Sequence, residues 1–169
     1  LCQQGIEEQM THTIERAVYT DRKHAADIGY LMNCYASDPM GGGKPLSEDI
    51  RAKLANELNK IPHAFSAICY VSGKPAGLIN CFEVFSTFKC KPIINVHDVV
   101  VAEDFRGQGI SHLLLDEVEK IAKERNCCKI TLEVLEGNTV AKGSYIKFGF
   151  GNYELDPAFG KAMFWEKEL

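Results

Sequence analysis

The chain has 169 residues, of which 46% are hydrophobic and 25% charged, and its formal net charge is −4. This length suits one domain with a sizeable core, and the acidic balance argues against a nucleic-acid partner, which normally binds a basic face. No apolar stretch approaches the roughly 20 residues that span a bilayer and no signal-peptide pattern opens the chain, so we expect no membrane partner and a cytoplasmic location.

The N-terminal residues indicate where the domain begins, and the cysteines indicate which thiol and metal chemistry to expect. Met10 is a candidate natural start, so residues 1–9 are interpreted as an extension or a remnant of cloning outside a single domain at 10–169. The seven cysteines are odd in number and form no C-x-x-C pair, which predicts reduced thiols rather than disulfides or a zinc site. The histidines also lack metal-ligand spacing, so no metal is expected.

The first half of the chain predicts a strand, two helices and a hairpin. Asp21 and Ser47 are typical helix caps, and apolar residues recur at helical spacing after Asp21. The turn at 72–75 separates two apolar runs and predicts a hairpin. The predicted elements are a strand at 13–20, a helix after Asp21, a loop at 38–45, a helix from Ser47 to about 60, and strands at 64–71 and 77–88.

The second half predicts strands at 93–101, 129–135 and 163–167, and helices at 109–125 and 138–148. The helix at 109–125 is amphipathic, with i,i+4 pairs between Asp116 and Lys120 and between Glu119 and Lys123. Early hairpins and a late strand–helix–strand unit predict a mixed α/β fold, with a mostly antiparallel central sheet and helices on both faces. The predicted buried stripe of this helix is Ile110, Leu113, Leu114, Val118 and Ile121.

A glycine turn opens the helix at 109–125, shortly after the apolar run Val99-Val100-Val101. Unpaired N–H groups at a helix start point outward, and the helix dipole adds partial positive charge there. Glycine lets an anion approach this backbone closely. We therefore interpret the turn as a pyrophosphate site formed by the run Arg106-Gly107-Gln108-Gly109-Ile110-Ser111.

Two other phosphate-binding motifs fit the sequence poorly. A dinucleotide fingerprint needs G-x-G-x-x-G, but His112 occupies the position of the third glycine. A nucleotide P-loop needs G-x-x-x-x-G-K-[ST], but around Gly43-Lys44 the first glycine is replaced by Asp38 and the hydroxyl residue by Pro45. Both motifs are set aside.

A third pattern matches in two separate blocks. Residues 106–111 resemble the R/Q-x-x-G-x-G/A turn of the GNAT superfamily of N-acetyltransferases, which binds the pyrophosphate of acetyl-CoA. Residues 138–150 resemble the family's second block, N-x-x-A-x-x-x-Y-x-x-x-G-F. Ser111 departs from the first pattern, although serine is small and its hydroxyl can donate to a phosphate. The resemblance covers most of residues 13–169.

The resemblance implies a GNAT-like fold and direct transfer of an acetyl group from acetyl-CoA to a primary amine of a small molecule or peptide. It implies cofactor contacts from the turn at 106–111, from the strand backbone at Val99, Val100 and Val101, and from Asn138, for which an ordinary helix cap is the other interpretation. It also implies that Tyr145 is the general acid. Packing of Tyr145 against neighbouring aromatic residues is the structural alternative.

Three polar side chains interrupt apolar strands and are candidate general bases: His97, Asp98 and Glu83. Charge in a buried strand needs a partner or a cleft. Strand alternation predicts that Asp98 shares a face with Val96 and Val100 and that His97 lies on the other face. The resemblance assigns the role of base to none of the three.

The loop after the first helix is the predicted acceptor wall. Asp38 is a candidate partner of a cationic amine, and Gly41 and Gly42 provide either mobility or close backbone approach. A solvated, disordered connector is the other interpretation of this loop. The amine itself is left open by the sequence.

A non-catalytic acyl-CoA binding or sensing module is the alternative function. Such a module would keep the glycine turn but would need neither Tyr145 nor a base. The family often forms dimers, so a homodimer is one expectation for the oligomeric state.

Overall fold

Two central strands, β2 (Ala64–Val71) and β3 (Lys74–Ser86), are largely buried in the computed structural model, which describes residues 11–153, 156–160 and 162–169. Their turn consists of Ser72 and Gly73, with φ values of 48° and 77°. Positive φ at both turn residues matches the twist of the two strands. The turn is therefore shorter than predicted, and Lys74 and Pro75 already lie in β3.

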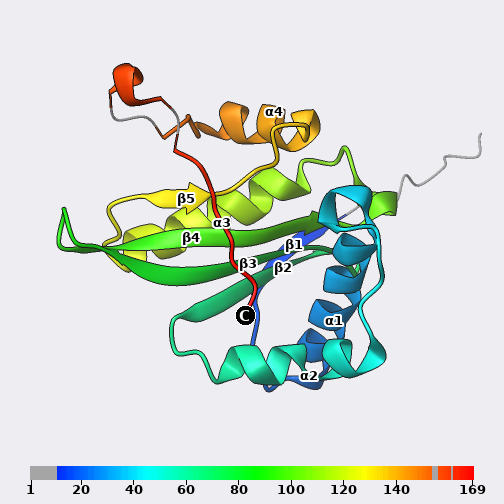
Figure 1. The fold of residues 1–169 in the computed structure, drawn as a ribbon. Coiled ribbons are helices and arrows are strands. Elements are labelled where there is room, and N and C mark those ends of the chain that lie inside the picture. Colours follow the sequence, from blue (N-terminus) through cyan, green and yellow to red (C-terminus); the bar gives the residue numbers. More distant parts are fainter. Residues whose placement is uncertain (1–10, 154–155, 161) are drawn as a thin grey trace, which may run out of the picture. The chain divides into compact units, whose positions relative to one another are not determined.

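Five strands form one sheet in the order β1-β2-β3-β4-β5 (Figure 1). β1 (His12–Arg16), β2, β3 and β4 (Lys91–Val101) pair antiparallel, and β5 (Ile130–Leu132) joins β4 in parallel. This mixed sheet confirms the predicted fold class. β1 and β5 are shorter than predicted.

The strand predicted at 163–167 is wrong. Residues 162–169 have no regular secondary structure, and Met163, Phe164 and Trp165 are exposed. An apolar run forms a strand only where a neighbouring strand accepts its hydrogen bonds, and no strand in the described part of the chain pairs with this one.

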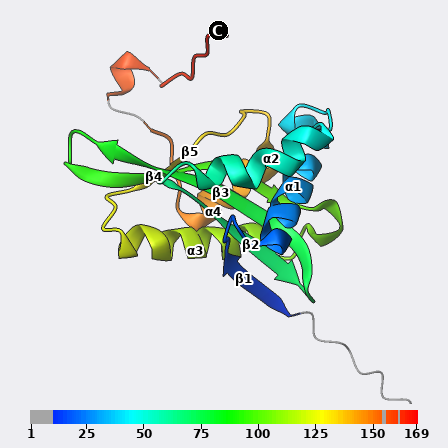
Figure 2. The same ribbon diagram turned by 90° about the horizontal axis from the view of Figure 1, so that it is seen from below.

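Helices cover both faces of the sheet, as predicted. α1 (Arg22–Ser37) and α2 (Glu48–Asn59) lie against one face, and α3 (Ile110–Glu124) lies against the other (Figures 1 and 2). Asp21 and Ser47 cap α1 and α2, as the sequence predicts. Short 3₁₀ turns, η1 (Pro39–Gly41) and η2 (Glu103–Phe105), follow α1 and β4.

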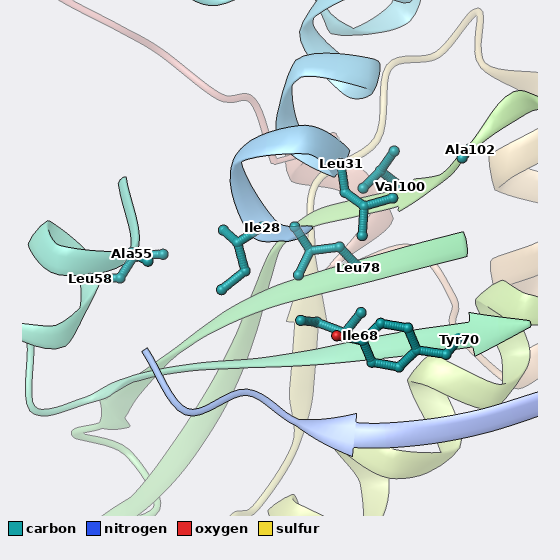
Figure 3. Close-up of a cluster of buried hydrophobic side chains, with 9 residues drawn as sticks. All are labelled: Ile28, Leu31, Ala55, Leu58, Ile68, Tyr70, Leu78, Val100 and Ala102. Carbon is teal, nitrogen blue, oxygen red and sulfur yellow. The ribbon is translucent and has the colours of Figure 1, made fainter. Parts of the chain in front are cut away.

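Adjacent residues of β3 lie on opposite faces of the sheet. Leu78 belongs to a buried cluster with α1 and α2, whereas a Cβ on Gly77 would lie 2.6 Å from Cγ2 of Ile110 in α3. The start of α3 therefore lies close to the sheet because residue 77 has no side chain. The cluster on the α1/α2 face comprises Ile28, Leu31, Ala55, Leu58, Ile68, Tyr70, Leu78, Val100 and Ala102 (Figure 3).

Two details of α3 differ from the prediction. Leu115 is fully buried while Leu113 is only partly buried, because the buried stripe is centred between Leu114 and Val118. Lys123 pairs with Glu119 as predicted, but Lys120 pairs with Glu117 rather than Asp116. The buried residues of α3 are Ile110, Leu114, Leu115, Val118, Ile121 and Ala122.

The chain divides into two compact units, Leu1–Leu135 and Glu136–Leu169. The first contains the sheet and α1 to α3; the second contains α4 (Thr139–Phe148) and η3 (Pro157–Phe159). The extension predicted at 1–9 lies outside the described residues. Within the described part of the chain, no helix has the length and apolar character needed to cross a membrane.

Candidate active site

The glycine turn before α3 leaves the start of this helix open. Gly107 and Gly109 have φ values of 80° and 74°, and, apart from the adjacent residues of the chain, no described residue lies within 4 Å of a Cβ built on either. α1, α2 and α4 begin with a side-chain cap, whereas α3 begins at Gly109 without one. Uncapped amides at the positive end of a helix suit a diphosphate. A side chain at either glycine would strain the backbone and occupy this space, so the turn fits the predicted cofactor.

The other side chains of the turn have defined surroundings. Arg106 donates through Nε to the carbonyl of Val101 (3.3 Å) and through Nη2 to Oδ2 of Asp38 (2.8 Å). Gln108 carries a buried Oε1 atom without a hydrogen-bond partner among the described residues. A buried acceptor that lacks a donor costs free energy. This oxygen is therefore a candidate acceptor for an N–H or O–H group of a bound molecule.

The strand that leads to the turn has an open edge. β5 pairs with only three residues of β4, Ile94, Asn95 and Val96. Between His97 and Val101, the described pairing of β4 is with β3 alone. Backbone groups of Val99 to Val101 on the β5 side are thus placed to pair with amides of a bound molecule, as the sequence predicts for the pantetheine arm.

A β-bulge changes the predicted alternation in β4. Asn80 and Cys81 are consecutive in β3, but they pair with Asp98 and Val96, so His97 is an extra residue. Asp98 therefore faces α1 and α2, whereas Val96 faces α3; the prediction that these two residues share a face is wrong.

The candidate bases are divided between the two faces. The ring of His97 lies 5.5 Å from that of Phe82, edge to face, and Phe82 packs against the α1/α2 cluster. His97 thus reaches the face that also carries Asp98. Glu83 follows Phe82 on the opposite face, where it forms an ion pair with Arg125 at the end of α3 (3.0 Å).

A partly buried hydrogen-bond chain across three strands ends at Asp98 and was missed from the sequence. Ser66 in β2 donates to Oδ1 of Asn80 in β3 (2.6 Å), and Nδ2 of Asn80 donates to Oδ2 of Asp98 (3.0 Å). Tyr19 hydrogen bonds to the Ser66 hydroxyl (2.8 Å). Ser66 and Asn80 each interrupt an apolar run, which is the signal that could have identified them.

Tyr35 links Asp98 to the loop after α1. Burial raises the pKa of Tyr35, and the negative charges of Asp98 and Asp38 raise it further. The N–H of Met40 and the guanidinium of Arg106 hold the pKa of Asp38 below its usual range. Both carboxylates therefore act on the same phenol, but the charge of Asp38 already has a cationic partner.

The glycines of this loop have structural roles. A Cβ on Gly41 would lie 2.0 Å from the carbonyl oxygen of Tyr35, so this position requires glycine for close approach. Gly42 follows η1 with a φ of 116°. Asp38 caps η1 through Met40 (2.8 Å), which gives the loop a defined conformation rather than that of a disordered connector.

In the second unit, Asn138 and Tyr145 lie on or next to α4. Oδ1 of Asn138 accepts from the N–H of Ala141 (3.1 Å), which confirms its interpretation as a helix cap. The ring of Tyr145 contacts that of Phe150, with centroids 5.9 Å apart. The packing interpretation of Tyr145 is therefore satisfied, and its role as an acid stays a prediction.

Comparisons with known proteins agree with this geometry. A family model described as the acetyltransferase (GNAT) family matches residues 30–150. An uncharacterized N-acetyltransferase of Methanocaldococcus jannaschii is 32% identical over 89 residues, which are 52% of this chain and 39% of that protein. The chain thus spans about two fifths of the length of this curated relative.

Solved structures show the same fold at low identity. The aminoglycoside N-acetyltransferase AAC(6')-Iy in complex with CoA has a TM-score of 0.73 at 16% identity, over 97% of this chain and 99% of that chain. A ribosomal-protein-alanine N-acetyltransferase from Brucella melitensis biovar Abortus 2308 has a TM-score of 0.66 at 18% identity, over 86% and 99% of the two chains. These likenesses support the fold independently of the family match.

Proposed function

Because the chain belongs to the acetyltransferase (GNAT) family, we propose that it is an N-acetyltransferase that transfers an acetyl group from acetyl-CoA directly to a primary amine of a small molecule or peptide. Family membership supports acyl transfer as the general chemistry. The observation that carries the proposal is the open start of α3, where Gly109 provides no side-chain cap and where β4 from His97 to Val101 pairs, among the described residues, with β3 alone.

The residues proposed to hold the cofactor are mostly backbone groups. Amides of residues 107–111 bind the diphosphate, and main-chain groups at 99–101 bind the pantetheine arm. The hydroxyl of Ser111 adds a donor at the helix start. Because Oδ1 of Asn138 already caps α4, a cofactor contact from this side chain falls to its Nδ2 atom.

Asp98 is the candidate base that the structure favours. It lies on the α1/α2 face, accepts a hydrogen bond from Asn80, and influences Tyr35, whereas Glu83 is paired with Arg125 on the other face. His97 shares the face of Asp98 and stays the second candidate.

The proposed reaction needs a base and an acid. Acetyl-CoA supplies the acetyl group as a thioester. Asp98 accepts one proton from the acceptor ammonium, so that the nitrogen lone pair forms the new C–N bond while the C–S bond breaks. The nitrogen then releases its second surplus proton to solvent, which leaves the neutral amide, and Asp98 also returns its proton to solvent. Tyr145 donates its hydroxyl proton to the leaving sulfur, and that proton is replaced from solvent.

The acceptor is proposed to be a cationic amine. The charge of Asp98 attracts such a group, while Arg106 neutralises Asp38. The names of two structural neighbours specify an aminoglycoside and a ribosomal-protein alanine as the molecules that those proteins acetylate. An acceptor panel should therefore include both polyamine-like small molecules and peptides with a free N-terminus.

A negative charge introduced at the cofactor turn tests the diphosphate site. Gly109→Asp places a carboxylate at the diphosphate site and should abolish CoA binding in calorimetry and acetyl-CoA-dependent thiol release with the amine panel. Gly73→Asp is the matched control, because Gly73 has the same kind of φ (77°) and open surroundings but lies in the β2–β3 turn. Its CoA affinity should stay within about twofold of wild type, because residue 73 lies outside the cofactor turn. Both variants bear comparable backbone strain, so a difference in affinity between them reports the charge at the turn.

Two outcomes would contradict the proposal in different ways. Unchanged CoA affinity in Gly109→Asp would show that the turn is not the diphosphate site. Tight CoA binding by the wild-type chain without thiol release for any amine would favour the alternative, a non-catalytic acyl-CoA binding or sensing module.

A further inference from the structure

We propose that the hydrogen-bond chain from Tyr19 through the buried residues Ser66 and Asn80 holds Asp98 in its reactive orientation, with Asn80 as a positioning residue. The inference rests on the proposed function, in which Asp98 is the base. The chain joins the segment before α1 to three neighbouring strands, with links of 2.8, 2.6 and 3.0 Å.

The direction of every link follows from the hydrogens available. A serine hydroxyl has one hydrogen, and Ser66 donates it to Oδ1 of Asn80. The hydroxyl of Tyr19 must therefore donate to Ser66 rather than accept from it. The carboxylate of Asp98 can only accept from Asn80. All donors point toward Asp98, so the chain ends on a carboxylate oxygen that accepts a hydrogen bond.

The orientation of the Asn80 amide is fixed by its partners. The residue is 4% exposed, its oxygen accepts from Ser66, and its nitrogen donates to Asp98 and to Sδ of Met32 (3.2 Å). A flipped amide would place its oxygen against the carboxylate oxygen of Asp98, and neither atom carries a hydrogen to share. The arrangement therefore has one satisfied orientation.

Asp98 needs such support because it lies at the β-bulge. An extra residue in a strand disturbs the regular alternation and leaves the side-chain direction less determined by the ladder. The bond from Asn80 holds Oδ2 of Asp98 and leaves Oδ1 as the oxygen that takes the proton. A hydrogen bond that fixes one carboxylate oxygen also fixes the direction of the other. Residues that support a reacting group from behind generally orient it in this way.

The surrounding titratable groups do not replace this support. Tyr35 on α1 and Cys81 on β3 are the groups whose pKa the charge of Asp98 raises, and burial is the larger cause in both. Both are therefore protonated and neutral near pH 7. His97 neighbours Asp98 on β4, and the charge of Asp38 in the loop after α1 also raises the pKa of Tyr35.

Tyr19→Phe tests the chain at its far end and keeps the aromatic ring. Tyr70→Phe is the matched control: its hydroxyl also donates on the α1/α2 face, but to Oδ2 of Asp27 (2.7 Å) and not toward Asp98. We expect kcat to fall about threefold in Tyr19→Phe and about tenfold in Asn80→Ala, and to stay at the wild-type value in Tyr70→Phe.

A double-mutant cycle distinguishes positioning from a general loss of structure. In an Asp98→Asn background, Tyr19→Phe should cause no further fall in kcat, because the group that the chain positions is already altered. An equal fall in both backgrounds, or an unchanged kcat in both Tyr19→Phe and Asn80→Ala, would overturn the proposal.

A second readout does not depend on activity. In ¹³C NMR of the side-chain carboxyls, the Asp98 signal is identified by its loss in Asp98→Asn. Its chemical shift should change in Tyr19→Phe, since the hydrogen bonds behind the carboxylate are altered, and should stay the same in Tyr70→Phe. An unchanged Asp98 chemical shift in Tyr19→Phe overturns the positioning role even if the wild-type chain proves to transfer no acetyl group, which would contradict only the proposed function.

Discussion

At the scale of single residues, the core accommodates buried polar groups through hydrogen bonds and buried thiols as neutral groups. Ser66 and Asn80 are almost fully buried, and their partners satisfy their hydrogen-bonding groups. Burial raises the pKa of Cys69 to about 11 and raises that of Cys81 as well. These thiols therefore stay protonated and pack as small apolar groups, and the cysteines in the described part of the chain are free, as predicted.

Tyr145→Phe separates the two interpretations of that residue. Phenylalanine keeps the ring contact with Phe150, so the free energy of unfolding should change by less than about 0.5 kcal/mol. The lost hydroxyl should lower kcat about tenfold or more, with CoA affinity nearly unchanged, because an acid acts on the chemical step.

The measurements for Tyr145→Phe are steady-state kinetics at a pH where chemistry limits the rate, CoA calorimetry and urea denaturation. Tyr153→Phe serves as a control tyrosine in the same unit. Full turnover in Tyr145→Phe would leave this residue with a packing role alone.

At the scale of elements, the close contact between β3 and the start of α3 connects the core to the cofactor turn. Ile110 is both the first residue of α3 and the nearest neighbour of Gly77. A shift of α3 away from the sheet would therefore move the amides that follow Gly109. The packing at one glycine is thus expected to affect binding at the helix start.

Gly77→Ala tests this connection. The new Cβ would lie 2.6 Å from Cγ2 of Ile110 and 3.2 Å from the Val100 carbonyl, so the neighbouring atoms, those of Ile110 above all, must shift. We expect a loss of about 1–3 kcal/mol in the free energy of unfolding and a CoA affinity that is several-fold weaker. Gly143→Ala in α4 is the control, since nothing lies within 4 Å of its Cβ in the described structure, and helix propensity predicts a small gain in stability.

Urea denaturation and CoA calorimetry on Gly77→Ala and Gly143→Ala test whether the packing of α3 affects cofactor binding. If Gly77→Ala is destabilised but binds CoA with wild-type affinity, the packing of α3 and the cofactor turn are not connected.

At the scale of the whole molecule, one ion pair joins segments that lie 68 residues apart. Arg106 of the cofactor turn binds Asp38 of the loop after α1. This contact attaches the predicted acceptor wall to the predicted cofactor turn within the first unit. Such a pair, partly exposed, contributes modestly to stability, but it fixes the loop that carries η1.

Asp38→Asn removes the charge and keeps an oxygen for the N–H of Met40. The pKa of Asp38 is lowered in the folded state. The contribution of its ionised carboxylate to the free energy of unfolding is therefore present above the unfolded pKa and is lost as pH falls through the folded pKa. The free energy of unfolding of the wild type should thus exceed that of Asp38→Asn by about 0.5–1 kcal/mol at pH 7, and this difference should shrink below about pH 4. Urea denaturation across this pH range provides the measurement, and a difference that is constant with pH would exclude the ion pair as its cause.

The sequence by itself determined the features that depend on local patterns. The caps at Asp21, Ser47 and Asn138, the amphipathic α3 and the glycine turn follow from hydrogen-bonding capacity, helical periodicity and positive φ, which are properties of neighbouring residues. The two motif blocks likewise lie within short segments and point to the family that the comparison at 30–150 shows.

Only the tertiary structure decided which side chains meet across the sheet. The β-bulge at His97, the chain that ends at Asp98 and the pairing of Arg106 with Asp38 each join residues from different strands or loops. The false strand at 163–167 has the same origin, since strand formation needs a neighbouring backbone. Register and long-range contacts depend on how the whole chain packs, and one residue of shift in a strand reverses the face of every side chain beyond it.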